Sequence, residues 1–428
     1  MRSQFIQILF FLFLLTQQTW ALDFDTKTEV YVAGNSYAVD SEFAEKNQVF
    51  YFLSSENKVI FNSKYEFALS PEVYYLDNLK IKDQDKALVE PKEVGLKYFG
   101  SHLSWTLGFF QMKKEGPDIL DPLDYQQPKN YLDPLHSGKL ALLGLKAELA
   151  VNNYLSFEVG YTPKNRIPVI PQESSAWYPR EGVLPTESES FLITLPDNPN
   201  YRINNEERSK DDLKNNYIFK TKITTSYTDI ILQVAETLSS SPDISPTLTG
   251  TLISTTPVFA IKLDNPIELD VRWKKVKNYG GGFNIPLESM GLIIKVFSNQ
   301  EVSENKKTLM STIALEKTLG NWIAILEATA QQINSRVDNS NLSTITNLYE
   351  NAQALGLRYA PNDKFSLLAG GLYDSKKGSY VATLRPKYFF TQNAYTELQV
   401  VAVGGKEGAL LSYFDKADSA SLKIGTSF

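Results

Sequence analysis

The sequence predicts an all-β protein whose strands form an antiparallel barrel across a membrane, and three observations lead to this prediction. Apolar and polar residues alternate with a period of two in many segments, a pattern that only an extended strand separates onto two faces. Turn-forming residues interrupt these segments at intervals of roughly ten residues, the length of a tilted strand that crosses a bilayer. No long helical pattern occurs in the 428 residues.

The clearest alternation is found in the segments 217–224, 266–274, 365–373, 394–403 and 420–428. In the last of these, apolar side chains occupy the even positions and small or polar ones the odd positions. Turn signals lie between such segments at Asn152-Asn153, Asp264-Asn265-Pro266, Leu319-Gly320-Asn321, Pro361-Asn362-Asp363 and Gln392-Asn393. Asn, Asp, Gly and Pro favour turns because they accept or impose the backbone angles that a strand does not use.

Composition excludes several kinds of site. The absence of cysteine rules out a disulfide scaffold, a thiolate metal site and a cysteine nucleophile, and two histidines cannot supply three imidazole ligands. The formal net charge of −6 argues against a nucleic-acid partner. We expect no cofactor and no metal.

The first 21 residues are predicted to be an export signal. Arg2 precedes an apolar run over 5–15, and Thr19-Trp20-Ala21 offers small residues around a cleavage point. The alternative, a transmembrane anchor, needs about 20 apolar residues, more than this run contains. Residues 22–428 then form a single barrel domain, and any membrane crossing within it must use strands.

A closed single-chain bacterial barrel has an even number of strands with both termini on the same side. We predict 18 strands, within a range of 16 to 20. Counting back from the last strand places the turns at 392–393, 361–364 and 319–321 on the periplasmic side and 405–417 on the outside. The region 251–306 does not resolve into strands, and 22–47 is either a first strand or a periplasmic stub.

A soluble β-sandwich is the competing architecture, and its apolar faces would meet in a dry core. The barrel is favoured because charged residues follow one another on one face of 266–274 and because long polar segments alternate with short turns. Aromatic residues also gather near strand ends, where girdles would lie at the two membrane interfaces: Tyr154, Tyr161, Tyr217, Tyr279, Trp322, Tyr359, Tyr373 and Tyr388.

The last strand resembles the terminal strand of Gram-negative outer-membrane proteins, since it alternates back to Ala420 and ends in the aromatic Phe428. The resemblance implies that Phe428 serves as an assembly signal for the barrel-assembly machinery, with the lipid bilayer of the outer membrane as the destination.

Part of the chain also resembles large porin-like families related to alginate exporters and an uncharacterised outer-membrane group. The resemblance is carried by residues 107–111, by Gly116-Pro117-Asp118 and by Asp121-Pro122-Leu123-Asp124. Those families show a Gly-Arg-Gln strand end and a Trp-Gly loop. Here Phe109 or Phe110 replaces the arginine and no Trp-Gly is present, so their polyuronate selectivity is not carried over.

Two long loops are predicted, at about 112–139 and 164–213, and both are rich in proline, which cannot join a strand ladder. The second mixes arginines with glutamates. Opposing charges on an inserted loop narrow a pore and set its ion preference, so Arg166, Arg180, Arg202 and Arg208 are candidate constriction residues. The alternative is a solvated surface loop.

No catalytic motif stands out. His102 and His136 have no recognisable nucleophile partner, so we expect the protein not to be an enzyme. The spacing of Asp118, Asp121, Asp124 and Asp133 is not that of an EF-hand loop, and aspartate before proline is also ordinary turn chemistry.

The predicted function is an outer-membrane channel that passes small polar or charged solutes through a water-filled lumen by diffusion. The polar faces of the strands supply the candidate lumen residues: Glu268, Asp270, Arg272, Lys274, Arg358, Arg385, Lys387, Glu397 and Lys423. The alternatives are a surface-display adhesin or receptor barrel and a fatty-acid-type transporter. The oligomeric state stays open.

Overall fold

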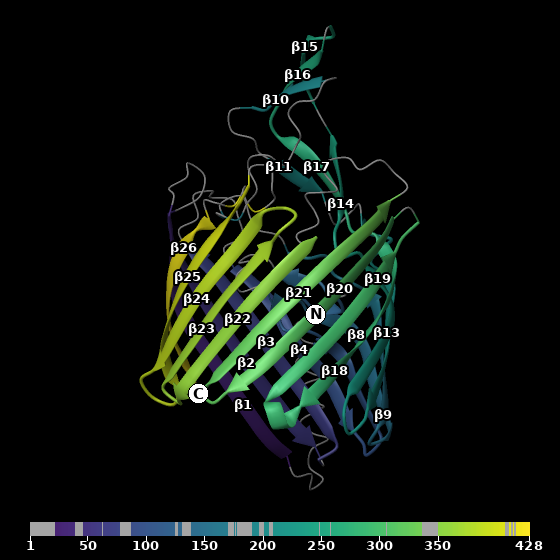
Figure 1. Ribbon diagram of the computed structural model, residues 1–428, viewed down its shortest axis with the longest axis vertical. Coiled ribbons are helices and arrows are strands. Elements are labelled where there is room, and N and C mark those ends of the chain that lie inside the picture. Colours follow the sequence, from purple (N-terminus) through teal and green to yellow (C-terminus); the bar gives the residue numbers. More distant parts are fainter. Residues whose placement is uncertain are drawn as a thin grey trace, which may run out of the picture.

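Eighteen strands close into one antiparallel barrel in the computed structural model (Figure 1). The structure describes residues 22–38, 46–61, 63–77, 87–124, 127–130, 138–169, 175, 177, 191–196, 201–204, 209–247, 249–256, 258–304, 306–335, 350–406, 411, 414 and 417–428. The predicted export signal at 1–21 lies outside these residues. The prediction of 18 strands is confirmed.

The barrel strands follow one another around the wall in chain order, each paired with the next. They are β1 (Leu22–Tyr37), β2 (Asn47–Phe61), β3 (Tyr65–Asp77), β4 (Ala87–Phe99), β5 (Leu103–Phe110), β8 (Leu142–Asn152), β9 (Leu155–Lys164), β12 (Lys214–Thr224), β13 (Asp229–Leu238), β18 (Lys275–Leu287), β19 (Leu292–Val302), β20 (Lys306–Leu319), β21 (Trp322–Ser335), β22 (Asn351–Asn362), β23 (Phe365–Asp374), β24 (Ser379–Phe389), β25 (Ala394–Gly405) and β26 (Ser419–Ser427).

The barrel closes between its first and last strands. β1 pairs with β26 over a register that runs from Glu29 opposite Ser427 to Tyr37 opposite Ser419. Thr28 and Phe428 extend the seam, because each donates its backbone N–H to the other's carbonyl, at 2.7 and 2.9 Å. Within the segment 22–47, residues Leu22–Tyr37 therefore form a first strand of the barrel. Closure leaves no open sheet edge, which hydrocarbon would not tolerate.

Connections differ between the two ends of the barrel. One end, here called the turn end, has short turns after β2, β4, β8, β12, β18, β20, β22 and β24. The turn after β18 includes a short 3-10 helix (Glu288–Met290), and Gly291 closes it in the left-handed region with φ 56°. The opposite end, the loop end, has the longest connections. The predicted turns at 319–321, 361–364 and 392–393 share the turn end, as expected. β25 ends at Gly405 and β26 begins at Ser419, both at the loop end.

The outer face of the barrel is apolar. In β25, Leu398 and Val400 point outward and are exposed, whereas Glu397 and Gln399 point inward and are buried. Aromatic rings stack on the outer face near both ends, with ring centroids 4.2 Å apart for Trp322–Tyr359 and 5.1 Å for Tyr161–Tyr217. These features suit a bilayer, with acyl chains against the leucines and headgroups near the rings.

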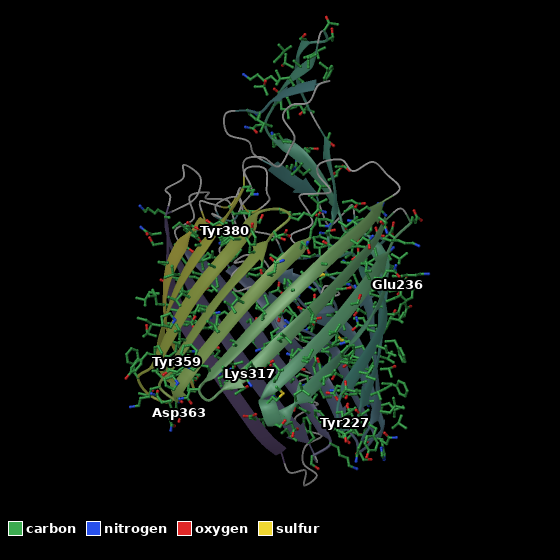
Figure 2. All side chains as sticks on the ribbon, in the orientation of Figure 1. Tyr227, Glu236, Lys317, Tyr359, Asp363 and Tyr380 are labelled. Atoms are coloured by element: carbon green, nitrogen blue, oxygen red, sulfur yellow. The ribbon has the colours of Figure 1, made fainter. Side chains whose placement is uncertain are left out.

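Figure 2 labels Tyr380 near the loop end and Tyr359 and Tyr227 near the turn end, which marks the two aromatic levels. Among the described residues, no helix is long and apolar enough to cross a membrane.

An arm rises from the loop end and is built by two neighbouring connections (Figure 1). The β9–β12 connection supplies β10 (Phe191–Thr194) and β11 (Tyr201–Asn204), and the β13–β18 connection supplies β14 (Asp243–Thr247), β15 (Gly250–Ser254), β16 (Phe259–Leu263) and β17 (Ile267–Arg272). These strands form two small sheets, in the orders β10-β16-β15 and β11-β17-β14. A further pair joins β6 (Lys129–Asn130) to β7 (Gly138–Lys139).

The arm corrects one prediction. β17 alternates as expected, yet it pairs with β11 and β14 rather than with a barrel strand. Its apolar side chains enter a buried cluster at the base of the arm instead of facing lipid. Two of its polar side chains pair outside the barrel, Arg202 with Glu268 and Arg272 with Asp212. The residues thereby removed from the predicted lumen lining are Glu268, Asp270, Arg272 and Lys274.

The two faces of the wall make a matched mutational test. Leu384 faces outward and Leu368 faces inward, and they are 44% and 42% exposed. Leu384→Glu places a carboxylate in lipid and should cost about 1–2 kcal/mol of unfolding free energy. Leu368→Glu lies opposite Arg358 and Arg385 in the ladder and should be neutral or stabilising. Denaturant unfolding in lipid vesicles measures both, and equal destabilisation would contradict the assignment of faces.

Candidate functional site

The inner wall of the barrel is lined mainly by polar and charged side chains, many of them in ion pairs. On β4, Lys97 lies 2.8 Å from both Glu66 and Glu93, and Lys92 lies 2.8 Å from Glu56. On β24, Arg385 lies 2.9 Å from Glu397. Such a mixture of signs along a wet surface is typical of a lumen that carries solutes.

The connection between β5 and β8 folds into the barrel. One of its anchors is Glu327, an inward-facing residue of β21 that is almost completely buried. The two carboxylate oxygens accept the backbone N–H groups of Ile119, at 2.9 Å, and Leu120, at 2.6 Å. A second anchor is the ion pair between Asp118 and Lys295 of β19, at 3.0 Å. Charge-assisted hydrogen bonds of this kind are roughly twice as strong as neutral ones.

Apolar contacts seat the same loop. Leu120 packs against Ala352, Ala354 and Leu372, and Leu123 packs against Ile231 and Phe297. A glycine of the wall, Gly280, leaves space for the side chain of Leu123. A Cβ at Gly280 would lie 2.5 Å from Leu123, which is well inside van der Waals contact.

Two aspartates hold the loop in shape. Asp121 is buried and accepts the backbone N–H groups of Leu123, at 2.9 Å, and Gly116, at 3.2 Å. Burial raises the pKa of Asp121 to about 6. Asp124 is bound by the ammonium groups of Lys129 and Lys139, and those partners outweigh its burial, so the pKa of Asp124 is lowered. These bonds make the inserted loop a built structure.

Three of the four aspartates considered as calcium ligands have other partners. Asp118 pairs with Lys295, Asp121 accepts backbone amides and Asp124 pairs with two lysines. Asp133 lies outside the described residues. Across the described part of the chain, no cluster of three or more carboxylate or imidazole side chains could hold a metal ion.

Five of the predicted lumen residues lie on the inner face of the barrel wall, as the alternation in their strands shows: Arg358, Arg385, Lys387, Glu397 and Lys423. The predicted constriction arginines are dispersed. Arg166 bonds Glu90 on the inner face of β4, at 2.7 and 2.8 Å, near the loop end. Arg202 belongs to the arm, and Arg180 and Arg208 lie outside the described residues.

Among the described residues, it is therefore the first long loop (112–139) that is anchored inside the barrel by Glu327 and Lys295. The second long loop contributes Trp177, which packs against Val401 and Val403 on the inner face of β25 at the loop end. Sequence reasoning missed Glu327 as the anchor. Its signal was present, because Glu327 is the only charged residue in the otherwise apolar and small-residue segment Ile323–Ala330.

The side of the wall formed by β24, β25, β26, β1, β2 and β3 is organised in three rows, here called the layered wall. The strand registers place Gln399, Ser421 and Asn35 side by side in the row nearest the loop end. The middle row holds Lys387, Glu397, Lys423, Ala33 and Phe50. The third row holds Phe389, Tyr395, Gly425, Tyr31, Phe52 and Tyr74.

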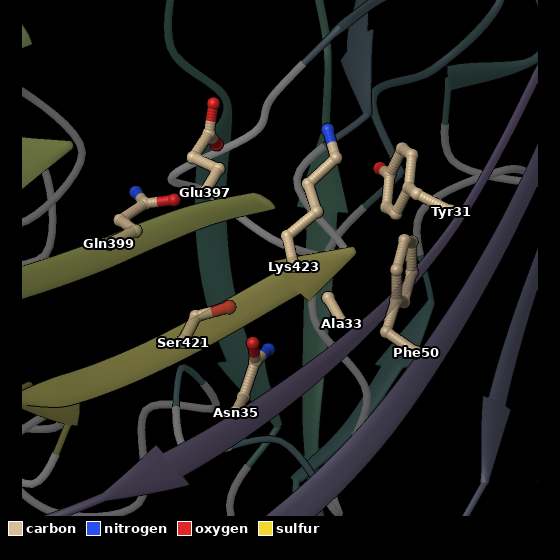
Figure 3. Close-up of a pocket in the computed structure, with 8 residues that line it drawn as sticks. All are labelled: Tyr31, Ala33, Asn35, Phe50, Glu397, Gln399, Ser421 and Lys423. Atoms are coloured by element: carbon tan, nitrogen blue, oxygen red, sulfur yellow. The ribbon is translucent and has the colours of Figure 1, made fainter. Parts of the chain in front are cut away.

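Figure 3 shows the recess at the centre of the layered wall, with Lys423 between Glu397 and Tyr31. The ammonium group of Lys423 is 3.6 Å from the ring centroid of Tyr31, and that of Lys387 is 3.6 Å from the centroid of Tyr395. Tyr395 donates its hydroxyl to Glu29 at 2.7 Å.

The inserted loop lies on the other side of the lumen. Its contacts with the wall fall on β12, β13, β18, β19, β21, β22 and β23. In the strand order of the barrel, β18 is half-way around from β1. The loop thus fills one side and faces the layered wall.

Comparison with solved structures returns porins at low sequence identity. OpdQ of Pseudomonas aeruginosa is 9% identical, with a TM-score of 0.49, over 95% of this chain and 97% of that one. OmpF of Salmonella typhi, in complex with daunomycin, is 10% identical, with a TM-score of 0.44, over 95% and 97%. A Rhodobacter blastica porin mutant is 8% identical, with a TM-score of 0.43, over 95% and 100%. No family model and no curated protein sequence matches the chain.

Removing the anchor should release the inserted loop. Glu327→Ala leaves the amides of Ile119 and Leu120 without acceptors, which should cost about 3 kcal/mol of loop-seating free energy. That cost corresponds to roughly a 100-fold rise in the rate of tryptic cleavage at the lysines of the loop. Gln331→Ala, on the same strand and near the loop end, is the control. Unchanged protection in Glu327→Ala would show that the anchor is dispensable.

The buried carboxyl of Asp121 predicts a pH dependence. Its pKa is about 6 in the folded loop and 3.8 as the reference, so the native loop holds the proton more tightly. Protonated Asp121 therefore stabilises the folded loop. This contribution is complete below about pH 4 and is lost as pH rises through about 6, a change of about 3 kcal/mol in loop stability. Hydrogen exchange of the loop amides, corrected for intrinsic rates, should follow this trend. Asp121→Asn should flatten it, and protection that grows with pH would contradict the assignment.

Proposed function

We propose that this protein is a porin-like channel of the outer membrane, through which small polar or charged solutes diffuse in a water-filled lumen. The observation that carries the proposal is the asymmetric lumen: the inserted loop is fixed to one side of the wall, and a polar, charged and aromatic surface faces it. A fixed loop narrows a pore without blocking it, so size and charge both select the solutes that pass.

The setting follows from the same architecture. The apolar outer face suits a lipid bilayer. The predicted export signal, and the resemblance of the strand ending in Phe428 to terminal strands of outer-membrane proteins, support an outer-membrane location reached through the barrel-assembly machinery. A surface-display barrel is a second candidate, and the arm favours it. Two sheets raised from the loop end give a partner protein a surface to contact.

Single-channel recording in planar bilayers separates the two functions. The purified barrel should give a steady open current in potassium chloride, because the lumen side facing the loop is lined by polar and charged groups. Glu327→Ala should raise the conductance or its noise, since the loop then moves. Heat-denatured protein is the control, and a barrel that inserts without current would be a display scaffold.

A further inference from the structure

The layered wall has the composition of a binding site, and its charged row is the first reason. Glu397 is paired with Arg385 at 2.9 Å. Lys387 and Lys423, on either side of Glu397 in the ladder, have aromatic rings as their close neighbours, and in the described part of the chain neither lies within ion-pair distance of a carboxylate. A further acidic side chain on this wall is Glu29, which accepts the Tyr395 hydroxyl. With Arg385 counted, three cations face two carboxylates.

Unpartnered polar atoms beside this row are the second reason. Gln399 is 4% exposed and lines the recess (Figure 3), and its Oε1 has no hydrogen-bond partner among the described residues. On the adjacent strand β24, Thr383 Oγ1 and Arg385 Nε are also buried, without a partner in the part of the chain that the structure describes. Leaving a buried polar group unpaired costs about 1–3 kcal/mol. A solute that brings hydrogen-bonding groups to these atoms recovers part of that cost.

The aromatic row is the third reason. Tyr31 stacks on Phe52 at 4.6 Å, Phe52 meets Tyr74 at 5.1 Å and Phe389 meets Tyr395 at 5.8 Å. Gly425 lies between Tyr395 and Tyr31 in the ladder, and a Cβ there would lie 2.6 Å from the Tyr395 ring. The Tyr395 ring therefore lies over the glycine. Tyr395 and Phe52 are buried, whereas Tyr31, Tyr74 and Phe389 are partly exposed, so the row offers some aromatic surface on the inner face. Aromatic rings at such a surface favour flat apolar groups.

We propose that the layered wall binds small organic anions with a flat apolar face, of which an aromatic carboxylate is the simplest. The carboxylate contacts the ammonium groups of Lys387 and Lys423, and the ring lies along the aromatic row. Binding is weak, with a Kd of about 1 mM or above, because a solute that passes through a channel must also leave it. This inference deepens the proposed function and rests on it.

The test is direct binding to the intact barrel in detergent, which needs no conduction. Saturation-transfer NMR with benzoate should show saturable binding, at least about tenfold tighter than for acetate and than for benzylamine. Lys423→Gln and Phe50→Leu should each weaken benzoate binding by about tenfold. The first removes a charge, and the second removes a ring of the middle row whose centroid lies 6.0 Å from Tyr31 and 5.8 Å from Tyr74 of the aromatic row. Lys146→Gln, on the inner face of β8 and outside the layered wall, is the matched control.

The outcomes separate the hypotheses. Benzoate binding equal to acetate, or equal loss in Lys423→Gln and Lys146→Gln, overturns the inference, since neither ring surface nor the Lys423 site is then selective. Heat-modifiable mobility on gels shows that each variant is a folded barrel. A barrel that binds benzoate selectively but carries no current retains the site and refutes the channel.

Discussion

Closure of the backbone hydrogen-bond ladder is the constraint on which the remaining structure depends. A strand in hydrocarbon has no water to satisfy its N–H and C=O groups, so each must pair with a neighbour on both sides. The seam from Glu29–Ser427 to Tyr37–Ser419 completes this circuit, and Thr28 and Phe428 extend it. Once the ladder is closed, period-two alternation sends every second side chain inward. The apolar residues of each strand then face lipid, and the polar residues that alternate with them line the lumen.

The closed ladder also explains how a loop can be held inside the barrel. The strand registers fix the positions of the charged groups on the inner face. Glu327 accepts hydrogen bonds from two consecutive backbone amides of the β5–β8 connection, which lies more than 200 residues away in the chain. Leu120 and Leu123 then fill apolar hollows left by alanines and glycines of the wall. Polar anchors set the place of the loop, and these small residues give it space.

Much of the barrel could be predicted from sequence, because alternation, turn residues and strand parity are local signals. They were sufficient for the strand number, the faces of 394–403 and 420–428, and the sides of the turns. The arm could not be predicted this way. Ile267, Leu269, Val271 and Trp273 alternate as a lipid-facing strand does, and only the pairing of β17 with β11 and β14 shows that they form a core. Which long loop folds into the barrel likewise depends on contacts between residues that are distant in sequence, so local patterns do not predict it.

The layered wall shows how register converts such local patterns into a surface. Lys387, Glu397 and Lys423 belong to three strands, and nothing in any one strand places them together. The ladder aligns them, and the same register aligns the rings one step toward the turn end. A slip of one residue in β26 would turn Lys423 into lipid and Leu422 into the lumen. The lipid-facing leucines therefore hold the register that brings the lumen charges together, and the outer face of the barrel determines what its inner face can bind.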